Sequence, residues 1–144
     1  MAVKGLDKVL NNLKKFGKEA EEDLHVITGS VASEISMDAQ NRAPVDLGKL
    51  RQSISFFEVE KSSYIVEANS TGLAPYAAYV EFGTGGPVRV PNEMKEIAIK
   101  FKGKGDRNIN MQPQPYLYPA FVKGRKQYLK DLKVLLKRLT KKYE

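Results

Sequence analysis

A long helical repeat of apolar residues constrains the fold more than any other feature. It runs from Val3 to about Asn41 with steps of three and four residues, which is the spacing of an amphipathic helix. Gly17 and Gly29 interrupt this repeat, and each costs about 1 kcal/mol relative to alanine in a helix interior. The sequence therefore allows a bend or a break at either position. A helix this long needs a surface, either the chain's own sheet or a neighbouring subunit. The apolar positions are Leu6, Val9, Leu10, Leu13, Phe16, Ala20, Leu24, Ile27, Val31, Ile35 and Ala39.

A turn and a hairpin follow this helix. Pro44 ends the helix, because the residue before a proline is disfavoured in the helical region. Asp46 is placed to cap a short turn over Leu47–Leu50. Ser53–Glu60 reads as a strand and Tyr64–Ala68, rich in β-forming residues, as its antiparallel partner after a short turn.

The segment Ala74–Thr84 has the most distinctive composition, with two tyrosines, a phenylalanine, three alanines and a single charge. Pro75 suits the first position of a helix, and Gly83 suits its end. We therefore predict a short helix of about two turns. The alternation of its side chains also suits a strand, and periodicity alone does not decide between the two.

Glu81 is the single charge of that segment and lies between Val80 and Phe82. It is either a solvent-facing helix residue or a half-buried partner of an arginine. We favour the second, with Arg42 or Arg51 as the partner, because an unpaired half-buried carboxylate is costly.

The last third of the chain contains two further helices. Asn92 is placed to cap a short helix over Glu93–Phe101. The proline-containing segment Met111–Phe121 suits an edge strand or a rigid connector, and the last helix begins near Pro119. Its predicted apolar stripe comprises Phe121, Tyr128, Leu132, Leu135, Leu136, Leu139 and Tyr143.

The predicted fold class is α+β, with a long N-terminal helix and a C-terminal helix packed on a small antiparallel sheet, and a short central helix. At 144 residues the chain is expected to form one domain, 1–144. No apolar run approaches the roughly 20 residues of a membrane helix, and the N-terminus does not resemble a signal peptide, so neither membrane contact nor export is expected.

Few residues are suited to catalysis or metal binding. The chain has no cysteine, which excludes a disulfide and a thiolate ligand. His25 is the only histidine and is interpreted as a solvated or partly packed helix residue. No group of His, Asp and Glu has ligand spacing, so no catalytic residue, cofactor or metal site is predicted, and an enzyme is not expected.

The basic charge is concentrated in the last helix. The chain has 24 Lys and Arg against 17 Asp and Glu, and residues 123–142 contain nine basic residues and one acid. They form either a solvated face or a contact for DNA or an acidic partner. Aromatic residues do not interleave with them, so contact without sequence readout is favoured. The nine are Lys123, Arg125, Lys126, Lys130, Lys133, Lys137, Arg138, Lys141 and Lys142.

Three motifs in order carry a resemblance: Ala43–Ile54, Tyr76–Thr84 and Gln114–Phe121. They resemble the minor tail-component family of long-tailed bacteriophages, whose usual wording is A-P-V-D-T-G-x-L-x-x-S-I, then Y-A-x-x-V-E-F-G-T, then P-x-P-F-L-x-P-A. The chain departs from it at Leu47 and Tyr116. The motif residues are Pro44, Asp46, Gly48, Leu50, Ser53, Tyr76, Ala77, Glu81, Phe82, Gly83, Thr84, Pro115 and Pro119.

The resemblance, which spans roughly residues 4–140, implies a structural virion protein of the head–tail junction, either a tail-completion or a connector protein. It implies a ring of six copies around the DNA channel, contact with neighbouring neck and tail proteins and with the genomic DNA, and assembly in the host cytoplasm. Within the chain, Ala74–Thr84 is expected to be a packing hub, and the loop Gly83–Arg107 to carry subunit contacts. The alternative function is a basic nucleic-acid-binding module that uses the lysine-rich helix.

Overall fold

A computed structural model describes residues 5–45, 48–69, 71–84, 91–102 and 111–144. It confirms the α+β class, with two long helices, a two-stranded antiparallel sheet and short helices between them. The elements are α1 (Leu6–Arg42), α2 (Gly48–Gln52), β1 (Ser55–Glu60), β2 (Ser63–Glu67), α3 (Ala77–Phe82), the 3₁₀ helix η1 (Asn92–Met94), α4 (Lys95–Lys102) and α5 (Leu117–Tyr143).

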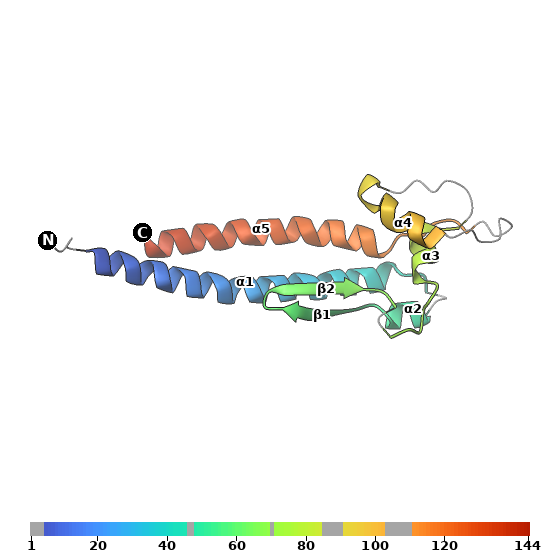
Figure 1. The fold of residues 1–144 in the computed structure, drawn as a ribbon, viewed down its shortest axis with the longest axis horizontal. Helices are drawn as coiled ribbons and strands as arrows, with labels where there is room; N and C mark the ends of the chain where they lie inside the picture. The colour runs from blue at the N-terminus through green and yellow to red at the C-terminus, as the bar shows by residue number, and fades with distance from the viewer. Residues whose placement is uncertain (1–4, 46–47, 70, 85–90, 103–110) are drawn as a thin grey trace.

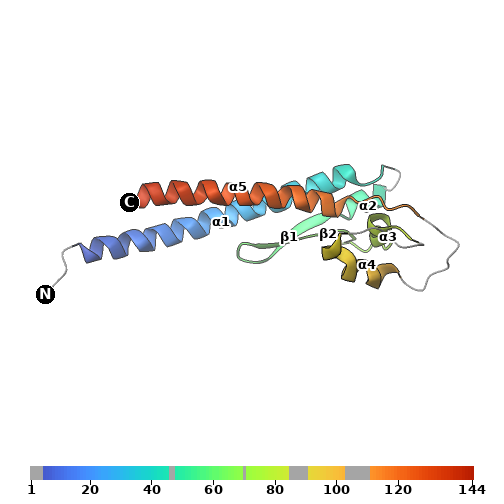
Figure 2. The same ribbon diagram turned by 90° about the horizontal axis from the view of Figure 1, so that it is seen from above.

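The two long helices lie side by side and run in opposite directions, and the hairpin of β1 and β2 lies along α1 (Figures 1 and 2). The short helices α2, α3 and α4 gather at one end of this elongated arrangement, and both termini lie at the other end. The first turns of α1 project past the end of α5. We call residues 6–13 of α1 the N-terminal extension.

Helix α1 is continuous through both of its internal glycines, so the break considered at Gly17 or Gly29 does not occur. Gly29 has a packing role, because a β-carbon there would lie 3.0 Å from the hydroxyl of Tyr64. The absence of a side chain lets the hairpin approach α1. The helix ends at Arg42, as the proline at position 44 predicts, and Ala43 is already extended (φ −60°, ψ 137°).

The two faces of the hairpin have different surroundings. Phe56 lies with Tyr64 on one face, with ring centroids 6.5 Å apart, and Tyr64 contacts α1 at Gly29. Phe57 is directly opposite Ile65 in the register, so these two side chains point away from α1. A β-bulge between Glu58 and Glu60 leaves Val59 without a partner residue on β2.

The hydrophobic core lies toward the end that holds the short helices. It combines α1 with residues of α2, α3 and the start of α5. Its buried members are Val31, Ile35, Ala39, Ala43, Leu50, Ile54, Ala74, Ala77, Val80, Tyr116 and Ala120. Two segments more than 70 residues apart, α1 and α5, therefore supply much of one core.

The predicted apolar stripe of α5 is partly wrong. Phe121 and Leu136 are about half exposed, whereas Ala120 and Gly124 are buried. At Gly124 a β-carbon would lie 2.2 Å from Cγ1 of Ile35, so the two helices come too close there for any side chain. The smallest residues, rather than the largest, mark the closest approach.

Two local predictions, at Pro75 and Asn92, need correction. Pro75 precedes helix α3: the N–H of Ala77 donates to the carbonyl of Ala74 (3.0 Å), which places Pro75 in a turn. Asn92 does not cap its helix but begins the 3₁₀ turn η1, which continues into α4.

The segment before α5 is a connector without strand structure, the second alternative named for it, and α5 begins at Leu117, two residues before Pro119. Asp46, Leu47 and their predicted cap lie outside the described residues. In the described part of the chain, no helix is both long and apolar enough to cross a bilayer.

Candidate functional site

The carboxylate of Glu81, on α3, lies at the start of α5. Oε2 accepts hydrogen bonds from the backbone N–H groups of Tyr116 (2.8 Å) and Leu117 (3.0 Å), and Oε1 accepts one from Tyr118 (3.0 Å). The first N–H groups of a helix have no partner within the helix, and the helix dipole favours a negative charge there. Glu81, itself buried, therefore caps α5 from another helix.

The predicted arginine partner of Glu81 is wrong. Arg42 donates to Oδ2 of Asp38 (2.8 Å), and Arg51 donates to the carbonyl of Ala43 (3.2 Å). Three N–H donors meet the demand of the buried carboxylate without a cation. Tyr116, the residue before α5, makes no side-chain cap, so the acceptor for the first N–H groups of this helix comes from elsewhere in the chain.

The chain around Glu81 is joined to the segment before α5 by backbone contacts. The N–H of Gln114 donates to the carbonyl of Val80 (2.8 Å). Thr84 and Met111 exchange two bonds: the Thr84 N–H donates to the Met111 carbonyl, and the Met111 N–H donates to Oγ1 of Thr84, both at 3.0 Å. The second and third sequence motifs therefore run beside each other.

Gly83 makes this close approach feasible. Its φ of +73° favours glycine, and a β-carbon there would lie 2.6 Å from the carbonyl oxygen of Met111. It also ends helix α3, as the sequence predicts. No other residue meets both conditions.

Tyr116 fixes the same region from the inside. Its ring is buried, and its hydroxyl donates to the carbonyl of Ala77 (3.2 Å). Burial raises the pKa of the phenol well above its usual value, and the charge of Glu81 raises it further, so the hydroxyl remains a donor. The start of α3 is thereby tied to the start of α5.

The first motif enters the same cluster through α2. Leu50 and Ile54 are buried, and Oγ of the buried Ser53 donates to the Leu50 carbonyl (2.7 Å) and accepts from the N–H of Asn69 (3.1 Å). We call the cluster formed by Leu50–Ile54, Ala74–Thr84 and Met111–Ala120 the hub. The motif residues Ala77, Phe82 and Pro119 lie within its segments, and Tyr76 packs against the core beside them.

Two motif residues are not packed in this way. Gly48 and Pro115 are exposed, and a β-carbon at Gly48 would meet no atom within 4 Å. The structure gives no reason for a glycine at position 48.

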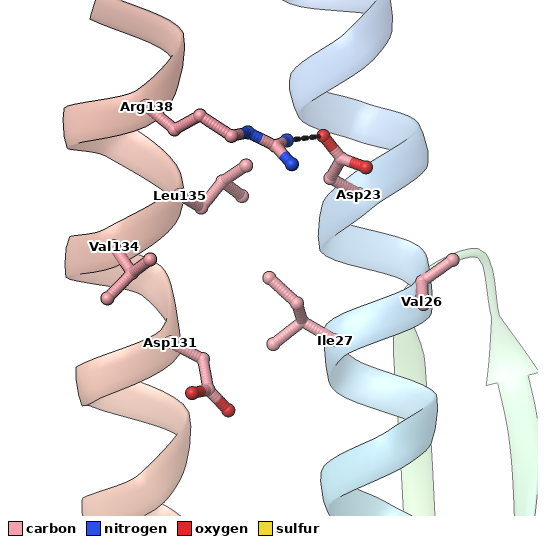
Figure 3. Close-up of a pocket in the computed structure, with 7 residues that line it drawn as sticks. All are labelled: Asp23, Val26, Ile27, Asp131, Val134, Leu135 and Arg138. Atoms are coloured by element: carbon pink, nitrogen blue, oxygen red, sulfur yellow. Dashed lines mark hydrogen bonds and ion pairs between the residues drawn. The ribbon is translucent and has the colours of Figure 1, made fainter.

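The basic residues of α5 divide into two sets. Three of them face acids of α1: Arg138 pairs with Asp23 (Figure 3), Lys142 lies 2.7 Å from Glu19, and Lys123 lies 3.6 Å from Asp38. The sequence did not predict these pairs, because they depend on the register of the two helices.

The other six basic residues of α5 are exposed and make no ion pair within the described part of the chain. Five of them recur at steps of three and four, so they lie on one face over about 22 Å of helix, at 1.5 Å per residue. We call these five the basic ridge: Lys126, Lys130, Lys133, Lys137 and Lys141. The sixth, Arg125, lies beside it.

A groove of about 260 Å³ lies between α1 and α5. Its lining is mostly apolar, and the Arg138–Asp23 pair spans it (Figure 3). The lining residues are Asp23, Val26, Ile27, Asp131, Val134, Leu135 and Arg138. The second acid of the lining, Asp131, accepts a hydrogen bond from the side chain of Gln127 (2.8 Å).

His25 lies between α1 and the hairpin. Its Nδ1 is 3.2 Å from Oε1 of Glu58, and its side chain is partly exposed. Among the residues that the structure describes, no three His, Asp or Glu side chains are grouped to hold a metal ion.

One comparison identifies a family. The model of the family described as "Bacteriophage HK97-gp10, putative tail-component" matches residues 7–83, more than half of the chain. The match includes all but the first residue of α1, the hairpin, the first motif and the second motif as far as Gly83, and it ends before Gln114–Phe121. No curated protein and no solved structure is significantly similar to the chain. The chain belongs to the HK97 gp10-like family of bacteriophage tail components.

Proposed function

We propose that this tail component completes the tail at the head–tail junction, where six copies form a ring around the DNA channel. It acts by shape and not by catalysis. It is assembled in the host cytoplasm and contacts neighbouring neck and tail proteins in the virion. The family supports a place in the phage tail, and the exposed apolar surface described next supports assembly.

The observation that carries this proposal is apolar surface that the described chain leaves uncovered. In the N-terminal extension, Leu6, Val9, Leu10 and Leu13 are 47–61% exposed, although they continue the stripe that is buried further along α1. On the hairpin, Phe57, Val59 and Ile65 are 42–47% exposed. Contiguous apolar surface of this kind marks interaction sites in soluble proteins.

The hub lies at the opposite end of α1 from the N-terminal extension (Figures 1 and 2). Its buried carboxylate cap and paired backbone segments hold α3 and the start of α5 together, which suits a subunit that positions its neighbours. The predicted contact loop Gly83–Arg107 remains a prediction, since residues 85–90 and 103–110 lie outside the described residues.

Electron microscopy of virions from a deletion strain tests the junction role. We expect separate filled heads and unattached tails, and expression of the protein in trans should restore complete particles. Heads and tails that stay joined without the protein would overturn the proposal. Light scattering of the purified chain, alone and with its neighbouring tail proteins, measures the number of copies.

A second candidate function is nucleic-acid binding, and the basic ridge favours it. Five lysines on one face without described ion pairs match the phosphate backbone of DNA, which is bound without sequence readout. An electrophoretic shift at two salt concentrations tests it, since the affinity should fall steeply as salt rises. Replacement of Lys130, Lys133 and Lys137 by Glu should abolish the shift, whereas the control Lys49→Glu in α2 should not. No shift at low salt would dismiss this function.

A further inference from the structure

The outer side of the hairpin lacks the helix that covers its inner side. Tyr64 packs on α1 at Gly29, and Phe56 lies beside Tyr64. We call Phe57 and Ile65, which are paired across the two strands, the outer hairpin face; nothing in the described part of the chain covers them fully. A sheet is normally covered on its apolar faces, and a two-stranded sheet is marginal without such packing. A second helix on the outer face would complete a layered helix–sheet–helix arrangement.

The N-terminal extension has the surface of such a helix. Its apolar side chains recur at positions 6, 9, 10 and 13, one stripe about 10 Å long at 1.5 Å per residue. The extension begins where α5 no longer covers α1, since Tyr143 at the end of α5 is in edge contact with Phe16.

The charges next to the extension are complementary to those of the hairpin. The extension itself holds one lysine and one acid, Lys8 and Asp7, and three further lysines, Lys14, Lys15 and Lys18, follow it directly. The hairpin, residues 55–67, contains three glutamates, Glu58, Glu60 and Glu67, and one lysine. That lysine, Lys61, is already paired with Glu21 of α1 (2.6 Å). Two copies of residues 6–18, or residues 6–18 and the basic ridge, would instead repel each other.

The extension of a copy does not reach the hairpin of that same copy. Both lie on the continuous helix α1: the hairpin contacts it from Glu21 to Gly29, beginning eight residues beyond Leu13. A straight helix cannot fold back on itself, so the partner surface must come from another molecule.

We infer that the N-terminal extension of one copy packs against the outer hairpin face of the next copy. The contact joins two different surfaces of the same chain, so it is head-to-tail, and repeated contacts of this type form a closed ring or a filament. The inference rests on the proposed function, since it names the interface of the proposed ring.

Engineered disulfides test the contact, and the chain has no native cysteine to interfere. Full-length Leu13→Cys and Ile65→Cys variants are mixed and oxidised. They should form a cross-linked heterodimer on a non-reducing gel. The controls pair Leu13→Cys with Val134→Cys and Ile65→Cys with Val26→Cys, because Val26 and Val134 are at least as exposed but lie on neither surface. Cross-linking no greater than in the controls, or greater for Leu13→Cys with itself, would overturn the inference.

A double variant, Leu13→Cys with Ile65→Cys in one chain, separates a ring from an open filament. A ring should give a ladder of bands that stops at the number of copies, and a ladder without an end would contradict closure. If light scattering shows an assembly but the Leu13–Ile65 pair does not cross-link above the controls, the inference fails and the proposed ring stands. If deletion leaves virions complete, the proposed function fails whatever the cross-links show.

Discussion

The two halves of α1 follow one sequence pattern but have opposite surroundings. Toward its end, Val31, Ile35 and Ala39 are buried beneath α5 and the hub. At its beginning, Leu6 and Leu13 continue the same stripe and are more than half exposed. The comparison teaches that a periodic pattern identifies which face of a helix is apolar, but not which molecule covers it. The following predictions test that difference.

The largest effect is expected at the hub. Glu81→Ala leaves three N–H groups at the start of α5 without their acceptor, so we expect a loss of about 4 kcal/mol in the free energy of unfolding, measured by urea denaturation. The control Glu21→Ala removes only an exposed pair with Lys61 and should change stability by less than about 0.5 kcal/mol. Equal effects of the two substitutions would mean that the cap is unimportant.

Truncation of a buried side chain in the α1–α5 contact should lower the stability of the monomer, whereas truncation of a side chain in the N-terminal extension should not. Leu139→Ala removes a fully buried side chain and should cost about 3 kcal/mol. Leu13→Ala should leave the urea midpoint of the monomer nearly unchanged while it weakens association in light scattering. A large destabilisation of the monomer by Leu13→Ala would contradict the contrast between the two halves.

Two glycines in the long helices should respond in opposite directions. Gly124→Ala places a methyl group against Ile35 and should destabilise by about 2 kcal/mol. Gly17→Ala, at an exposed position with no atom within 4 Å of the new methyl group, should stabilise by about 0.7 kcal/mol. Thermal midpoints of the two variants measure this. A destabilised Gly17→Ala would show that the glycine is needed for a bend.

The smallest effect concerns pH at the end of α5. Hydrogen bonds from Lys142 and Tyr143 hold the pKa of the Glu19 carboxyl below its usual value. A lowered pKa in the folded state means that the stabilisation is complete above the usual carboxyl range and is lost as the pH falls through the lowered value. The protection of the last turns of α5 against hydrogen exchange, measured relative to the intrinsic exchange rate at each pH, should therefore fall as the pH drops below the usual carboxyl range of about pH 4. Glu19→Gln should show faster exchange already at pH 7, whereas the control Glu22→Gln should match the wild type.

Much of the fold follows from local chemistry. Apolar periodicity predicted both long helices, Pro44 predicted the end of α1, and β-forming residues predicted the hairpin. The partner of Glu81 was not predictable in the same way, because 35 residues separate it from Tyr116. Gly124 was missed because an apolar stripe is recognised by its large residues, whereas this contact depends on a small one.

The division of the basic residues also depended on tertiary structure. Only the antiparallel register of α1 and α5 places Glu19 and Asp23 opposite Lys142 and Arg138. The sequence shows how many charges a helix carries, whereas the fold determines which of these charges pair with an opposite charge.

The two hydrogen bonds between Thr84 and Met111 affect which changes in chain length the fold can tolerate. These bonds hold the two ends of the segment between Thr84 and Met111 together. Glu81, which caps α5, precedes this segment in the sequence. The entropy cost of closing a loop grows only with the logarithm of its length, about 0.6 kcal/mol for each doubling. Insertions between these two anchors therefore cost the hub little entropy. Replacement of the whole segment would cost more, because it contains α4, whose Ala98 is buried.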